Sequence, residues 1–94
     1  DILDASIRRQ GQQLVIRVRG RDAISLLDSI EADFNNGLKD TTEQPLDGIR
    51  DGREETFVLE EPLDKAAGAT SVEVTLYDAA GNAAVRYLPI PPAP

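Results

Sequence analysis

Hydrophobic and polar residues alternate along several stretches of this chain, which is the pattern of a β-strand with one buried face. The clearest stretch is 13–19, where Leu14, Ile16 and Val18 share one face. The same period predicts four more strands, over residues 2–9, 55–59, 71–77 and 83–88. Their expected inward-facing residues are Leu3, Ala5 and Ile7, then Phe57 and Leu59, then Val72, Val74 and Leu76, and finally Val85 and Tyr87.

Residues 23–34 fit two secondary structures. From Ala23 onward, apolar residues recur at helical spacing, and an aspartate precedes them as an N-cap. The second half of the stretch also alternates as a strand would. We expect a loop through Leu26 and Leu27 and then a strand over residues 29–35, and a short helix is the alternative. The expected inward-facing residues of that strand are Ile30, Ala32 and Phe34.

Turn-forming residues separate these strands. The pair Asn36-Gly37 tolerates the positive φ angles of a type I′ turn and predicts a hairpin onto Leu38-Lys39. Residues 40–53 hold two Asp-Gly pairs, a proline and few apolar residues, so we expect a long polar loop there. Further turns are expected over residues 62–70, through a glycine, and over residues 78–82.

Short strands separated by turns about ten residues apart are typical of a β-sandwich. We therefore expect an all-β fold, an immunoglobulin-like β-sandwich of about seven antiparallel strands. This domain would occupy residues 1–88, and the proline-rich residues 89–94 would form a stiff tail or linker. With such a tail, and with an aspartate in place of an initiator methionine, we expect the chain to be part of a larger protein.

Charge is distributed unevenly along the chain. Seventeen acidic residues against ten basic ones give a net charge of −7, which disfavours nucleic acid as a partner. Arginines concentrate near the start of the chain, and acids concentrate in residues 40–64. Because opposite charges stabilise paired strands, this division predicts that the strand over 13–19 pairs with the strand over 55–59.

That pairing would bring Val15 and Val58 together on faces that are otherwise polar. With Arg17 beside them, these valines form a candidate contact patch for another protein or domain. Ordinary packing of β-branched side chains across two strands is the alternative explanation.

Residues 71–82 carry the most specific motif. An alternating strand of the form V-x-V-x-x-x-D ends at Asp78 and is followed by Ala79-Ala80-Gly81-Asn82, of the form A-x-G-N. This segment resembles the final hairpin of bacterial immunoglobulin-like and fibronectin type III-like modules. Residues 46–57 are similar to the Asp-Gly-rich loop and strand that precede that hairpin. The resemblance implies a spacer, adhesive or accessory unit of an extracellular, periplasmic or cell-surface protein, although the tryptophan and cysteine pair of antibody domains are missing.

A cluster of acids suggests a calcium site as an alternative. Calcium binds about six to eight oxygen ligands, and four carboxylates crowd one loop. The helix-loop-helix calcium pattern is not met, because its third and twelfth positions, counted from the first acid, are Ile49 and Val58. A solvated acidic turn explains the same residues without a metal. The four candidate ligands are Asp47, Asp51, Glu54 and Glu55.

No residues point to catalysis. The chain has no histidine and no cysteine, and a domain of 94 residues is too small to build a deep cleft. No apolar run approaches the roughly 20 residues of a membrane helix. We expect a non-catalytic spacer or protein-interaction module, monomeric in isolation and without a cofactor. The alternative is a calcium- or carbohydrate-binding module that uses the acidic loop and the last hairpin.

Overall fold

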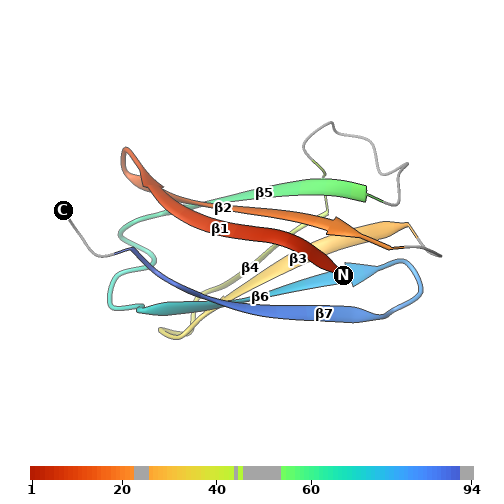
Figure 1. The fold of residues 1–94 in the computed structure, drawn as a ribbon. Coiled ribbons are helices and arrows are strands. Elements are labelled where there is room, and N and C mark those ends of the chain that lie inside the picture. The colour runs from red at the N-terminus through yellow and green to blue at the C-terminus, as the bar shows by residue number, and fades with distance from the viewer. Residues whose placement is uncertain (23–25, 44, 46–53, 92–94) are drawn as a thin grey trace.

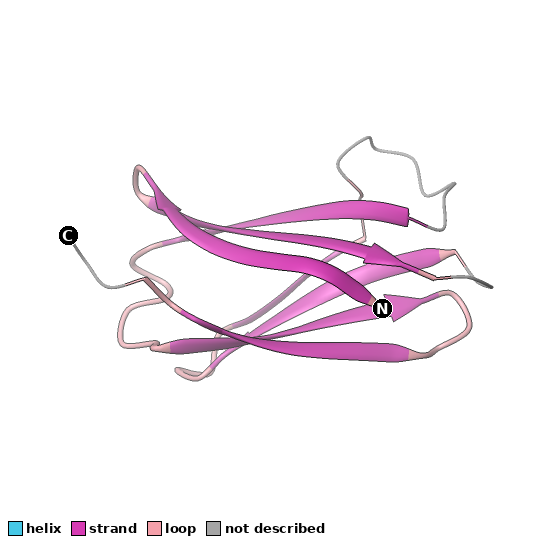
Figure 2. Cartoon of the chain, in the orientation of Figure 1, coloured by secondary structure: helices cyan, strands magenta, loops and turns pink. Residues whose placement is uncertain are grey.

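The computed structural model describes residues 1–22, 26–43, 45 and 54–91. These residues form two antiparallel sheets and no helix (Figures 1 and 2). One sheet has the strand order β1-β2-β5, and the other has the order β4-β3-β6-β7. The all-β sandwich expected from the sequence is confirmed. The strands are β1 (Ile2–Gln10), β2 (Gln13–Arg21), β3 (Leu27–Phe34), β4 (Lys39–Thr42), β5 (Glu54–Pro62), β6 (Ser71–Asp78) and β7 (Ala83–Pro89).

The core lies between the two sheets, and the inward-facing residues of four strands make up most of it. Each fully buried Val, Leu, Ile or Phe side chain stabilises the fold by about 1.5–3 kcal/mol relative to exposure. The alternation of the sequence predicted these rows correctly. They are Leu14, Ile16 and Val18 of β2, Ile30, Ala32 and Phe34 of β3, Phe57 and Leu59 of β5, and Val72, Val74 and Leu76 of β6.

Gly20 continues the inward-facing row of β2, and it allows the two sheets to approach each other. A Cβ atom at this position would overlap Cδ2 of Leu76 on the opposite sheet. It would also lie 3.4 Å from Cδ1 of Leu27. Space, and not backbone angle, therefore favours glycine here.

The ambiguous stretch is a strand from Leu27 to Phe34, and its first three residues, 23–25, lie outside the described residues. β3 begins at Leu27, which is 2% exposed, so the expectation of a loop through that residue is wrong. The helical alternative fails over the described part of the stretch, because β3 pairs along its length with β6. Buried apolar partners in β6 therefore favour the strand over the helix, a choice that the spacing of residues alone leaves open.

The hairpin from β3 to β4 exists, but its turn is not type I′. A type I′ turn needs positive φ at both central residues, and only Gly37 has it, with φ of 96°. The amide of Gly37 donates to the carbonyl oxygen of Phe34 at 3.0 Å, and the amide of Phe34 donates to the carbonyl oxygen of Leu38 at 2.8 Å. One glycine in the left-handed region is enough for this longer turn.

β4 lies where a polar loop was expected. Its four residues contain no apolar side chain, so alternation could not reveal it. Pairing with β3 holds it as the edge strand of its sheet. Most of the remaining expected loop, residues 44 and 46–53, lies outside the described residues.

Near its start, β1 departs from strict alternation. The register shifts between Ile2 and Asp4, so that Ile2 packs against the core and Leu3 is 40% exposed. The expectation that Leu3 faces inward is therefore wrong. Ala5 and Ile7 pack against the core as expected.

The inward row of β7 is the opposite of the one expected. Val85 and Tyr87 are 50% and 70% exposed. Buried Val74 lies opposite Arg86, and buried Val72 lies opposite Leu88, so those two residues share the inner side of the sheet. Paired residues face the same side, and this fixes the orientation of an edge strand regardless of its own hydrophobicity.

Residues 89–91 are attached to the body of the domain. β7 extends to Pro89, and the amide of Ile90 donates to the carbonyl oxygen of Thr70 at 3.0 Å. Nε of Arg9 donates to the carbonyl oxygen of Pro91 at 3.2 Å. The domain boundary at residue 88 stays a prediction.

Candidate functional site

The outer side of the three-stranded sheet carries a row of arginines. β2 turns alternate residues outward, and Arg17, Arg19 and Arg21 occupy three successive outward positions. Because strand residues rise about 3.3 Å each, the three side chains leave the sheet at intervals of about 6.6 Å. We call this surface the arginine face. It comprises Arg8, Val15, Arg17, Arg19, Arg21 and Val58.

The predicted contact patch is brought together on this face. β2 pairs with β5, as the charge pattern predicted, and the register places Arg17 opposite Val58 and Val15 opposite Glu60. Val15 and Val58 are therefore diagonal neighbours on one side of the sheet, and both are partly exposed. The patch is a small apolar strip beside exposed guanidinium groups.

The arginines of β2 are only weakly neutralised by neighbouring acids. Nη1 of Arg19 lies 3.8 Å from Oε1 of Glu54, and both side chains are about half exposed, so this pair contributes about 0–1 kcal/mol. Within the described part of the chain, the side chains of Arg17 and Arg21 form no ion pair. Their guanidinium groups have free donors for a carboxylate or another anion.

A shallow hollow of about 260 Å³ lies at one end of the arginine face. Val15 and Glu60 form one part of it, and three glutamines of the β1–β2 hairpin form the rest. Amide groups can both donate and accept hydrogen bonds. The hollow therefore adds polar, uncharged contacts to the arginine row. These glutamines are Gln10, Gln12 and Gln13.

The charged residues on the outer side of the four-stranded sheet are mainly acidic, in contrast to the arginine face. Nζ of Lys39 lies 3.4 Å from Oε1 of Glu31 and 3.8 Å from Oδ2 of Asp33. Glu73 faces Tyr87, and the negative charge and a hydrogen bond of Glu73 raise the pKa of the tyrosine. The two broad faces of the sandwich thus differ in charge.

The structure separates the two described members of the candidate calcium set. Adjacent strand residues point to opposite sides of a sheet. Glu54 accordingly faces outward beside Arg19, whereas Glu55 faces inward and is buried. The other two members, Asp47 and Asp51, lie outside the described residues. The calcium site stays a prediction.

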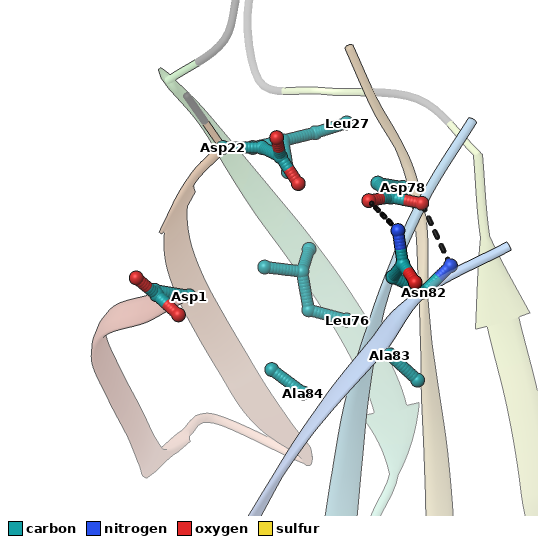
Figure 3. Close-up of a pocket in the computed structure, with 8 residues that line it drawn as sticks. All are labelled: Asp1, Asp22, Leu27, Leu76, Asp78, Asn82, Ala83 and Ala84. Atoms are coloured by element: carbon teal, nitrogen blue, oxygen red, sulfur yellow. Dashed lines mark hydrogen bonds between the residues drawn. The ribbon is translucent and has the colours of Figure 1, made fainter. Parts of the chain in front are cut away.

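The last hairpin uses the carboxylate of Asp78 to build its own turn. Oδ1 accepts from the amide of Ala80 at 3.0 Å. Oδ1 also accepts from the amide of Asn82 at 2.8 Å, and Oδ2 accepts from Nδ2 of Asn82 at 3.1 Å (Figure 3). Gly81 has φ of 90°, as the turn requires. The motif that carries the resemblance is therefore structural in this chain.

A hollow of about 220 Å³ beside this hairpin is lined by three aspartates. Figure 3 shows Asp1, Asp22 and Asp78 on separate sides of it. Among the described residues, no three acidic, histidine or cysteine side chains lie close enough together to hold a metal ion. The hollow thus combines separated aspartates with apolar residues, and its described residues form no cluster of metal ligands.

A pair of carboxyl groups was missed by the sequence analysis. Glu61 lies in the inward row of β5 and is 3% exposed, and its side chain forms a hydrogen bond with that of Asp40 on β4. Burial, and then this hydrogen bond, raises the pKa of Glu61 to about 7. The same hydrogen bond lowers the pKa of Asp40. Strict alternation from Phe57 and Leu59 would have placed Glu61 inward, but not beside Asp40.

Among the described residues, no helical segment has the length and hydropathy needed to span a bilayer.

Comparisons with protein-family models, with curated proteins and with solved structures found no match to this chain.

Proposed function

We propose that this chain is a non-catalytic immunoglobulin-like or fibronectin type III-like module of a larger bacterial protein, and that it acts outside the cytoplasm as a spacer and a protein-contact unit. Two antiparallel sheets of three and four strands, with the chain crossing between them, support this class of fold. So does the turn chemistry of Asp78 and Gly81.

The shape of the domain carries the spacer proposal. The molecule measures 41 × 22 × 18 Å, and its strands run along the long direction (Figure 1). β1 begins toward one end of the sandwich, and β7 finishes at the other (Figure 1). Neighbouring domains joined to these two strands would therefore be held apart by most of the long dimension.

A packed sandwich is stiff enough for this role. Its core side chains interdigitate between two hydrogen-bonded sheets, so the distance between its ends is fixed. A flexible linker of similar residue number would instead sample many separations. Attachment of Ile90 and Pro91 to the body further restricts the exit of the chain.

The arginine face supports the contact part of the proposal. It combines a strip of two valines with the guanidinium groups of Arg17 and Arg21, which form no ion pair with any described residue. Such a surface suits an acidic, extended segment of a neighbouring domain or another protein.

Small-angle X-ray scattering on the longer polypeptide would test the spacer role. We expect the flanking domains to keep one separation with the module in place, and to sample a broad range when a Gly/Ser linker replaces it. A module carrying Arg17→Gln is the control, since it removes one contact group and leaves the core intact. The proposal is wrong if the distance distribution is the same without the module, or if the gene encodes no further domain.

A further inference from the structure

β4 and β5 are the edge strands of different sheets, and they meet along one side of the sandwich. They contact each other there, and an isolated antiparallel bridge joins Pro45 to Phe57. We call this junction the β4–β5 seam. Continuous strand pairing holds each sheet together, but the seam depends on side chains.

Two carboxyl groups face each other across the seam. Asp40 lies opposite buried Ala32 in the β3–β4 ladder, which places it on the inner side of its sheet. Glu61 lies opposite buried Leu14 in the β2–β5 ladder, which places it on the inner side of the other sheet. The hydrogen bond between the two side chains therefore connects one sheet to the other.

Glu61 is poorly solvated in this position. Only 3% of the residue is exposed, and its Oε1 atom has no hydrogen-bond partner among the described residues. Oδ1 of Asp40 accepts from the amide of Thr41 at 2.8 Å, and Asp40 is exposed to water. The environment thus favours a neutral Glu61 beside a charged Asp40.

We infer that Asp40 and Glu61 share one proton, and that this proton holds β4 against β5, so that its loss loosens the seam. The Glu61 hydroxyl donates to a carboxylate oxygen of Asp40. When the proton leaves to water, two carboxylates remain in contact, and one of them is buried. The pKa of Glu61, raised to about 7, places this change near neutrality.

The surrounding charges are compatible with a neutral Glu61 beside a charged Asp40. Lys65, in the connection after β5, is the cation that acts on both carboxyl groups, and it favours their charged forms. β2 contributes apolar Leu14 on this side. On the outer side of β4, Nζ of Lys39 contacts Glu31 and Asp33 of β3, so these three charges face away from the seam.

Two nuclear magnetic resonance measurements on the full chain would test the inference. The side-chain carboxyl carbon of Glu61 should titrate near pH 7 and not near the ordinary glutamate value. The amides of β4, corrected for their intrinsic exchange rates, should exchange with solvent roughly tenfold faster at pH 8 than at pH 6. The inference is overturned if Glu61 titrates as an exposed glutamate.

Three variants separate the shared proton from a general effect of pH. Glu61→Gln keeps a neutral side chain and should abolish the pH dependence of exchange in β4. Glu60→Gln changes the adjacent outward residue and should leave that dependence unchanged. Asp40→Asn removes the facing charge and should lower the pH at which Glu61 titrates, which can be measured even if Glu61→Gln does not fold. Persistence of the wild-type pH dependence in Glu61→Gln, or an unchanged titration in Asp40→Asn, would contradict the inference.

Discussion

Two inward-facing positions that lack an apolar side chain, Gly20 and Glu61, constrain how this core can pack. Gly20 occupies a point where the sheets are too close for a side chain, and Glu61 places an acid where the core meets the β4–β5 seam. Each continues the alternation of its strand, so neither residue disturbs the fold pattern. Their costs are of different kinds, because one is steric and the other is electrostatic.

Replacing Gly20 by alanine should destabilise the domain by about 1–3 kcal/mol, because the added Cβ overlaps Cδ2 of Leu76 in a packed core. Urea denaturation would measure the loss. Leu76→Val removes the overlapping atom, so the double variant should lose less stability than the sum of the two single variants. Additive losses would show that the overlap is relieved elsewhere.

Glu61 should make stability fall as pH rises. Its pKa is raised from 4.5 to about 7 on folding, so between these values the folded state binds more protons than the unfolded state. The stabilisation is therefore complete below pH 4.5 and is lost as pH rises through 7, by about 3 kcal/mol in total. The lowered pKa of Asp40 acts in the opposite direction, but only at pH values near 4 and below.

Urea denaturation at pH 5 and pH 8 would measure this effect. Glu61→Gln stays neutral at both values, so it should be more stable than wild type at pH 8, and it should narrow or remove the difference between the two pH values. Glu60→Gln, at the exposed neighbouring position, should behave as wild type does. If Glu61→Gln and wild type lose stability in parallel between pH 5 and pH 8, the pKa of Glu61 is not raised in the folded state.

At the scale of elements, alternation predicted the strands whose inward rows are apolar, and it failed for β4 and β7. β2, β5 and β6 have apolar inward rows that the sequence shows directly. β7 was assigned the wrong face because Val85 and Tyr87 alternate as an apolar row, whereas the side it buries is fixed by pairing with β6. β4 has no apolar residue, and it exists because a hairpin continues the β3 ladder.

Of the two candidate sites, the sequence could predict the one that depends on strand pairing and could not predict the one that depends on contact between the sheets. The patch of Val15, Arg17 and Val58 could be predicted because it depends on the pairing of two strands, which the charge pattern indicated. The pair of Asp40 and Glu61 could not, because it depends on how two sheet edges meet. Local alternation contains no information about that contact.

The arginine row of β2 should bind an acidic polymer. Titration of the isotopically labelled domain with poly-L-glutamate should shift the amides of β2 and β5, and these shifts should diminish at high salt, since exposed charges are screened. The double variant Arg17→Gln/Arg19→Gln should lose them. Lys39→Gln, on the opposite sheet, should retain them. Equal shifts in the double variant and in wild type would exclude the arginine face as the contact surface.

At the scale of the whole molecule, calcium separates the spacer proposal from its alternative. A ligand that binds only the folded state raises the melting temperature as its concentration exceeds its Kd. The described acids Glu54 and Glu55 face opposite sides of β5, so we expect thermal unfolding in millimolar calcium to match that in a chelator. A calcium-dependent rise in Tm that is lost in Asp47→Asn/Asp51→Asn would instead establish a metal site in the acidic loop.

The two edge strands of the four-stranded sheet, β4 and β7, determine whether neighbouring domains in one polypeptide can exchange strands with this one. An uncovered strand edge invites a neighbour to add its own strand, which leads to domain exchange and aggregation. Here β4 offers only four residues and carries a lysine, while Arg86 of β7 reaches across to donate to the carbonyl oxygen of Ile2 at 3.1 Å. If copies of this domain followed one another in a polypeptide, each would consequently fold independently, without strand exchange between them during synthesis.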